Sequence, residues 1–145
     1  MTSTVVLGYD GSDAARAALE YAGDRAADGG RLYVVCVSEP PPAYLGRPYY
    51  QRVLDESLGY ARGLGEEAIS LLPAGADVTT ELLEGSPSEA IVKVAQTRSA
   101  DEIVVGSRGR GKVRAALGSV SQDVLHLADR PVVVIPNPIS TRNGA

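Results

Sequence analysis

The stretch that decides the fold reads IVVGSRGRGK at residues 103–112 and is followed by GSVS at 118–121. Its apolar start predicts a buried strand of a parallel sheet, because such strands are covered on both faces. Glycines after the strand let main-chain N–H groups approach a ligand, and the helical pattern opened by Gly118-Ser119 would attract an anion at its N-terminus. The stretch therefore predicts a phosphate cradle, and four cationic side chains lie in or beside it: Arg108, Arg110, Lys112 and Arg114.

The same letters also fit the P-loop pattern GxxxxGK at 106–112, except at the position after the lysine. Val113 stands there in place of the Ser or Thr whose hydroxyl would bind Mg²⁺. Gly118 interrupts the long helix that a P-loop requires, and the last apolar run, 132–135, ends without an aspartate. The glycines are also not spaced as in the Rossmann motif GxGxxG. We therefore interpret the stretch as a phosphate cradle of another kind.

Length and composition predict one globular domain over residues 1–145. The apolar content is 44%, but Phe and Trp are absent, so aliphatic side chains must fill the core. The formal net charge of −4 argues against general nucleic-acid or membrane-surface binding, and no stretch is long enough to span a bilayer. Cys36, the only cysteine, lies in an apolar run and is expected to be an inert buried thiol in a cytoplasmic protein. His126, the only histidine, is expected at a surface or an interface.

Apolar runs alternate with helical patterns along the chain. Ser12 or Asp13 can cap a first helix that Gly29-Gly30 would end, and SPSE at 86–89 is a capping box for another. The helix predicted at 51–72 has an apolar face from Val53 to Leu71. Residues 38–49, rich in Pro and Tyr, are expected to form a long loop, and residues 137–145 a frayed tail. The predicted strands are 4–8, 32–37, 78–83, 103–105 and 132–135.

This alternation predicts an α/β fold with a doubly wound, five-stranded parallel sheet and helices on both faces. Ligands of such sheets bind beyond the carboxyl ends of the strands, where the strand order reverses. The first strand ends in Tyr9-Asp10-Gly11 and the fourth in the glycine loop. If these strands are neighbours, Asp10 and the loop share one crevice.

These pieces, in this order and spacing, resemble a universal stress protein domain over nearly the whole chain. The resemblance rests on Asp10-Gly11-Ser12, the second strand ending at Val37, GSRGRGK at 106–112, GSVSQDVL at 118–125 and RPVVVIP at 130–136. It implies an adenine nucleotide alpha hydrolase-like sheet of strand order 3-2-1-4-5. It also implies a homodimer, expected here through Val132, Val133, Val134 and Ile135.

One branch of the family binds ATP or AMP through G-x2-G-x9-G-[ST]. By this resemblance Asp10 would bond the ribose or adenine, the Val37 main chain would read the adenine edge, and the glycine segment would hold the phosphates. For Asp10 and Ser119, helix capping is the simpler alternative, and for the cationic side chains a solvated surface. The residues assigned to the nucleotide site are Tyr9, Asp10, Val37, Gly106, Arg108, Gly109, Gly118, Ser119, Val120 and Ser121.

The sequence departs from that motif at one place, because the spacer at 110–117 has eight residues rather than nine. Three functions therefore stay open. The first is a nucleotide-binding stress-response or signalling protein without strong catalysis. The second is a nucleotide-free dimerisation or protein-interaction module, which the short spacer favours. The third is a slow ATPase, since Mg²⁺ could accompany a bound triphosphate.

Overall fold

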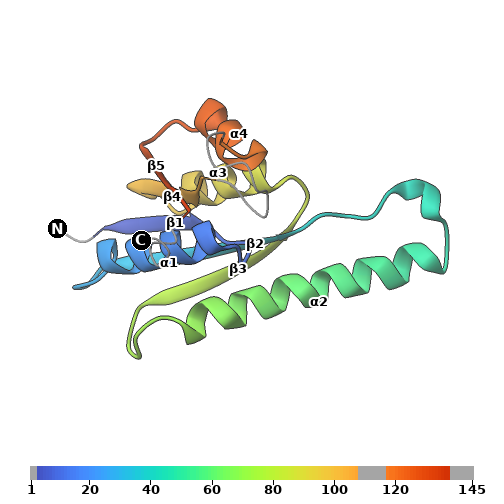
Figure 1. The fold of residues 1–145 in the computed structure, drawn as a ribbon, viewed down its shortest axis with the longest axis horizontal. Helices are drawn as coiled ribbons and strands as arrows, with labels where there is room; N and C mark the ends of the chain where they lie inside the picture. Colours follow the sequence, from blue (N-terminus) through green and yellow to red (C-terminus); the bar gives the residue numbers. More distant parts are fainter. Residues whose placement is uncertain (1–2, 108–116, 138–145) are drawn as a thin grey trace, which may run out of the picture.

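The computed structural model describes residues 3–107 and 117–137. Its five strands are β1 (Thr4–Gly8), β2 (Arg31–Ser38), β3 (Val78–Glu84), β4 (Glu102–Gly106) and β5 (Val132–Ile135). Its helices are α1 (Asp13–Arg25), the short 3₁₀ helix η1 (Ala43–Leu45), α2 (Tyr49–Ser70), α3 (Pro87–Thr97) and α4 (Ser119–Leu127). Strands and helices alternate along the chain, as the sequence predicts (Figure 1). None of the described helices is both long and apolar enough to cross a membrane.

The strands form one parallel sheet in the order β3-β2-β1-β4-β5. This confirms the predicted fold class, including the neighbouring positions of β1 and β4. The chain builds β1, β2 and β3 toward one edge and then crosses to the other side of β1. The strand order therefore reverses between β1 and β4.

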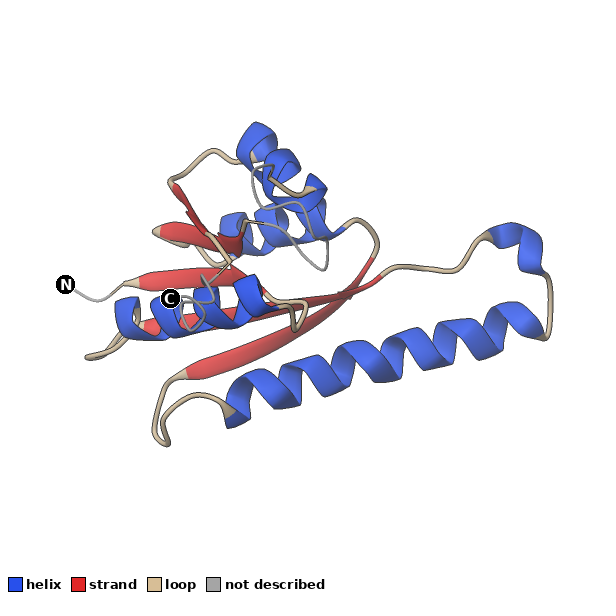
Figure 2. Ribbon diagram, viewed as in Figure 1, coloured by secondary structure: helices blue, strands red, loops and turns tan. Residues whose placement is uncertain are grey.

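The core has two layers, one on each face of the sheet. Val5 and Leu7 of β1 belong to the cluster covered by α1 and α2, whereas Val6 faces the cluster covered by α3 and α4 (Figure 2). This alternation follows from the two-residue period of a strand. Both clusters consist mainly of Val, Leu, Ile and Ala, as the lack of Phe and Trp requires.

The apolar face predicted for helix α2 is only partly buried. Its buried residues all lie in the C-terminal half and are Ala61, Leu64, Gly65 and Ala68, whereas Val53 near the N-terminus is 37% exposed. A helix of 22 residues is about 33 Å long. The seven residues of β3 span only about 23 Å. The helix is therefore longer than the strands it covers, and its N-terminal half extends past the sheet (Figure 1).

Three local features also differ from the predictions: the end of α1, the limits of the loop at 38–49 and the cap of α3. Helix α1 ends at Arg25, before Gly29-Gly30, and Asp28 already has a positive φ of 61°. The expected loop at 38–49 is shorter, because β2 includes Ser38, η1 lies within it and α2 begins at Tyr49. At α3 the capping box is not formed, since no side chain caps the helix and the Ser86 and Ser88 hydroxyls bond to each other at 3.2 Å. Most of the tail expected to fray, 138–145, lies outside the described residues.

Candidate functional site

The candidate site lies at the carboxyl ends of β1 and β4, where the strand order reverses. Leu7 pairs with Val104, so the residues that follow β1 emerge beside the end of β4. The start of α1 and the start of α4 lie at the same end of the sheet, because each follows one of these two strands (Figure 1). The fold thus brings the Asp10 segment and the glycine segment to one edge.

Asp10 is exposed and forms a tight turn with the start of α1. Its Oδ1 accepts a hydrogen bond from the Ser12 N–H at 3.0 Å. The N-cap of α1 is Ser12, whose Oγ accepts from the Ala15 N–H at 3.2 Å. Asp10 is therefore not the helix cap, and its carboxylate is presented to solvent at the strand end.

Tyr9 contributes its side chain to the core instead of to this edge. The ring is 4% exposed and packs in the cluster under α1 and α2. Its hydroxyl donates to Glu67 Oε2 on α2, and the Arg16 guanidinium of α1 lies 3.1 Å from the same oxygen. The assignment of Tyr9 to the nucleotide site can thus hold only for its main chain.

This contact changes the acidity of both partners. Burial, followed by the hydrogen bond to Glu67, raises the pKa of Tyr9 to about 12. The hydrogen bond from Tyr9 lowers the pKa of Glu67, and Arg16 acts in the same direction. The Tyr9–Glu67–Arg16 network therefore joins α1, α2 and the end of β1 at neutral pH. Nothing in the sequence pattern pointed to Glu67 or Arg16, because each is one charged residue on an otherwise ordinary helix surface.

Val37 presents its main chain beyond the end of β1. The paired register of β1 and β2 stops at Gly8 and Val35, and the Tyr9 N–H donates to the Val35 carbonyl at 3.0 Å. Hydrogen-bonding groups of a strand alternate between its two sides, so Val37 points to the same side as Val35. There β1 has already ended, which leaves the Val37 N–H and C=O at the open strand edge.

Gly106 has a packing role that the sequence did not reveal. A Cβ atom at this position would lie 2.9 Å from the Ala14 carbonyl carbon and 3.0 Å from the Ala15 nitrogen. Both are main-chain atoms of α1, which cannot move without moving the helix. Glycine is therefore required here for α1 to pack on β4, whether or not a ligand is present.

The N-terminus of α4 is capped by a glycine. Gly118 is its N-cap, and among the described residues no side chain accepts a hydrogen bond from the first turn. The first main-chain bond of the helix runs from Gln122 N–H to the Gly118 carbonyl, so the preceding N–H groups of Ser119, Val120 and Ser121 have no acceptor within the helix. Ser119 and Val120 are exposed, so these donors and the helix dipole together favour an anion.

Ser121 uses its hydroxyl for contacts within the protein, which leaves its N–H for the assigned role. It is 1% exposed, and its hydroxyl donates to the Ser107 carbonyl at 2.8 Å and to the Gly118 carbonyl at 3.0 Å. The Gly118 N–H donates to the same Ser107 carbonyl at 2.7 Å. These bonds hold the end of β4 against the start of α4. The Ser121 hydroxyl therefore links Ser107 to Gly118, and only the Ser121 main-chain N–H is directed to the helix end.

The remaining two assigned residues, Arg108 and Gly109, lie outside the described residues. Two predictions from outside the site are confirmed. Cys36 is 1% exposed and burial raises the pKa of its thiol to about 11, which agrees with an inert thiol. His126 lies exposed in the last turn of α4.

Comparison with known proteins is consistent with this architecture. Residues 1–136 match the Universal stress protein family. A universal stress protein of Thermus aquaticus is 42% identical over 137 residues, which cover 93% of this chain and 99% of that protein.

Two solved structures share the fold. The first is a universal stress protein in complex with cAMP, with a TM-score of 0.66, 27% identity and coverage of 94% of this chain and 98% of the other. The second is the universal stress protein from Archaeoglobus fulgidus in complex with dAMP, with a TM-score of 0.56, 28% identity and coverage of 93% and 98%. The family match, the close relative and the shared strand order agree, and the chain belongs to the universal stress protein family.

Proposed function

We propose that the protein binds an adenine nucleotide, ATP or AMP, at the carboxyl ends of β1 and β4. The observation that carries this proposal is the glycine-capped N-terminus of α4. Its Gly118 cap offers no side-chain acceptor, and three consecutive N–H groups follow it. A phosphate group would satisfy these donors and would lie at the positive end of the helix dipole.

The adenosine part of the nucleotide would lie toward β1 and β2. The exposed Asp10 carboxylate can accept hydrogen bonds from ribose hydroxyls, while its Oδ1 stays fixed by the Ser12 N–H. The open main chain of Val37 offers one donor and one acceptor, which suits the edge of adenine. Asp10 follows β1, which lies next to β4, and Val37 belongs to β2, one strand further from β4. One extended ligand could therefore reach Asp10, Val37 and the start of α4.

The two structural relatives support this ligand class. The molecules bound to them, cAMP and dAMP, share an adenine base and a phosphate with ATP and AMP. The overall role that follows is a cytoplasmic stress-response or signalling protein that responds to nucleotide binding and has no strong catalysis.

Calorimetric titration with ATP, AMP and adenosine tests the proposal. Asp10→Asn keeps an Oδ1 acceptor for the Ser12 N–H but removes the charge, so it should weaken all three ligands without lowering the melting temperature. Gly118→Val adds bulk at the phosphate position, and the extended backbone of Gly118, with φ −73° and ψ 167°, tolerates a side chain. This variant should lose roughly tenfold or more in ATP affinity, the value of one or two charge-assisted hydrogen bonds.

Gly63→Ala is the matched control, because a Cβ there meets nothing within 4 Å. Its ATP affinity should equal that of the wild type. Equal ATP affinity in Gly118→Val and in the control would remove the basis for the phosphate cradle. Tight ATP binding with equally tight adenosine binding would place the contacts on the nucleoside alone.

We also propose that two copies pair through β5. This strand forms one edge of the sheet, and all four of its residues are partly exposed. The Ile103 and Ser107 N–H groups donate to the Pro131 and Ile135 carbonyls, so every second residue of β5 faces β4. By this alternation Val132 and Val134 direct their N–H and C=O groups to the open edge, where a second copy could pair with them.

A further inference from the structure

A cavity lies at the opposite end of the sheet from the candidate nucleotide site. It has a volume of about 700 Å³ and lies between the C-terminal part of α1 and the segment that joins α2 to β3. Leu32 and Val78, which line it, lie at the starts of β2 and β3, whereas Asp10 and Val37 lie at strand ends. The volume is within the range of roughly 300–1,000 Å³ that small-molecule sites occupy.

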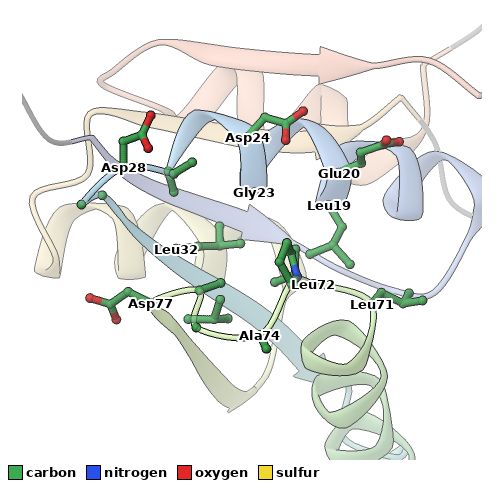
Figure 3. A pocket seen from close by; sticks show the side chains of 18 of the residues that line it. Leu19, Glu20, Gly23, Asp24, Asp28, Leu32, Leu71, Leu72, Ala74 and Asp77 are labelled. Carbon is green, nitrogen blue, oxygen red and sulfur yellow. The ribbon is translucent and has the colours of Figure 1, made fainter.

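The floor of this cavity is apolar. Leu19 and Leu32 are each 2% exposed, and the Leu72 side chain approaches from the opposite wall (Figure 3). Gly23 of α1 faces Leu72, and a Cβ atom at Gly23 would lie 2.9 Å from Leu72 Cδ2. Leu72 therefore packs closely against Gly23, and the two walls touch at this point. The accessible apolar surface comes from Leu71, which is 55% exposed, and from the partly exposed Leu72 and Val78, which can hold an aliphatic or aromatic group.

The rim carries excess negative charge. Its ionisable lining residues are one arginine, Arg16, and four carboxylates, Glu20, Asp24, Asp28 and Asp77, which leaves a net charge of −3 at neutral pH. Arg16 is already paired with Glu67, and Asp77 lies 3.4 Å from Arg31.

The other three carboxylates stand along the α1 side of the rim (Figure 3). Among the described residues, Glu20, Asp24 and Asp28 have no ion pair and no side-chain hydrogen bond. Their charge is therefore available to a ligand at the mouth of the cavity.

Two helix ends add to this negative potential. Helix α1 ends at Arg25 and α2 ends at Ser70, and the residues just after each end line the cavity. The C-terminus of a helix carries a partial negative charge, so acidic residues such as Asp24 and Asp28 at that end are unfavourable for the helix itself. Two helix C-termini and three unpaired carboxylates thus surround one apolar floor.

We propose that this cavity binds a small organic cation, an amine with an aliphatic or aromatic body. The ammonium group would lie at the carboxylate rim and the apolar body would lie over Leu71, Leu72 and Val78. A nucleotide would be repelled from the same place, so the two sites select ligands of opposite charge. A bare metal ion fits less well, because the described residues hold no group of three or more His, Cys, Asp or Glu side chains placed to bind one.

The test uses 2-phenylethylamine as the probe and 2-phenylethanol as its neutral counterpart, both titrated into nucleotide-free ¹⁵N-labelled protein. Glycine amides report the position of binding. Those of Gly23, Gly29, Gly30 and Gly75 line the cavity, whereas Gly85 and Gly106 lie at the other end of the strands. We expect saturable shifts of the first group with the amine at millimolar or lower concentration, and much weaker shifts with the alcohol.

The charge contribution is tested with the double variant Glu20→Gln/Asp24→Asn. Its matched control is Glu56→Gln/Glu66→Gln, which removes the same charge from exposed positions of α2 outside the cavity. Because exposed charges interact weakly through water, we expect the rim variant to bind the amine roughly three- to tenfold more weakly and the control to match the wild type.

Three outcomes would overturn the proposal. They are the absence of saturable shifts, equal affinity for the amine and the alcohol, and equal weakening by the two double variants. None of them bears on ATP binding at the other end of the sheet.

Discussion

Replacing Tyr9 by phenylalanine tests whether this side chain belongs to the core or to the nucleotide site. Phenylalanine keeps the buried ring and removes only the hydroxyl that donates to Glu67. No cavity forms beyond the space of one oxygen atom. The change in stability should therefore report the hydrogen bond itself.

The size of the effect follows from the surroundings of the acceptor. A hydrogen bond to a charged group contributes about 1.5–3 kcal/mol. The Glu67 side chain is 33% exposed and also contacts Arg16, so water and the guanidinium can replace part of the lost bond. We expect the lower end, about 1.5 kcal/mol, which corresponds to a decrease in Tm of about 3–6 °C for a chain of this size.

The difference in the free energy of unfolding between wild type and Tyr9→Phe should also depend on pH. The pKa of Tyr9 rises from its ordinary value of about 10 to about 12 in the folded protein. The contribution of the protonated hydroxyl is therefore complete below about pH 10, and it is lost as the pH rises toward 12. The folded-state pKa of Glu67 is lowered, so its contribution is present above the ordinary carboxyl pKa and is lost in acid. The difference in the free energy of unfolding should thus be largest near neutral pH and should become smaller at both acidic and alkaline pH.

Urea unfolding followed by circular dichroism measures the stability, and calorimetry measures ATP affinity on the same samples. Tyr44→Phe is the control, because Tyr44 is 85% exposed. We expect Tyr9→Phe to be less stable and to bind ATP as the wild type does. A variant with unchanged stability and weakened ATP binding would refute the placement of the hydroxyl in the core.

Three further predictions concern other parts of the fold. Gly106→Ala should lower the free energy of unfolding by about 1–3 kcal/mol in urea titrations, because its Cβ would overlap the main chain of α1. An unchanged midpoint would show that α1 can shift. Cys36 should react with a chromogenic disulfide reagent at mildly alkaline pH far more slowly in the native protein than in urea, since burial raises its pKa to about 11. Equal rates would contradict its burial. Light scattering should give twice the chain mass of 15.1 kDa, and Val134→Pro should reduce it to one chain by removing an outward N–H. A wild-type monomer would exclude pairing through β5.

Much of the fold could be predicted from the sequence because it depends on neighbouring residues. The runs at Thr4–Gly8 and Val132–Ile135 are strands with the predicted limits, since continuous β-branched residues favour extended backbone and burial on both faces. Gly118 begins α4 as predicted. The alternation of strands and helices then restricts the topology to a parallel sheet, and the resemblance to a known family supplied the strand order.

The direction and surroundings of individual side chains could not be obtained in this way. Tyr9 follows a strand that ends at the site, yet its ring points into the core, because α1 and α2 enclose a space there and Glu67 supplies an acceptor. Ser121 was assigned to phosphate through its backbone or its hydroxyl, and the structure shows that the hydroxyl donates to the Ser107 carbonyl, 14 residues earlier in the chain, which leaves only the N–H for that role. The pattern predicted the apolar face of α2 but not how much of it is buried, and the N-terminal half of the helix extends past the strands.

The sequence alone therefore determined where the strands form, where the last helix begins and which glycines precede it, because these features depend on local backbone preferences and on period. The tertiary structure alone decided which side chains face the site, why Gly106 must be glycine and where a cavity with an acidic rim opens. These depend on which distant segments meet, and a one-dimensional pattern contains no distance between residues far apart in the chain.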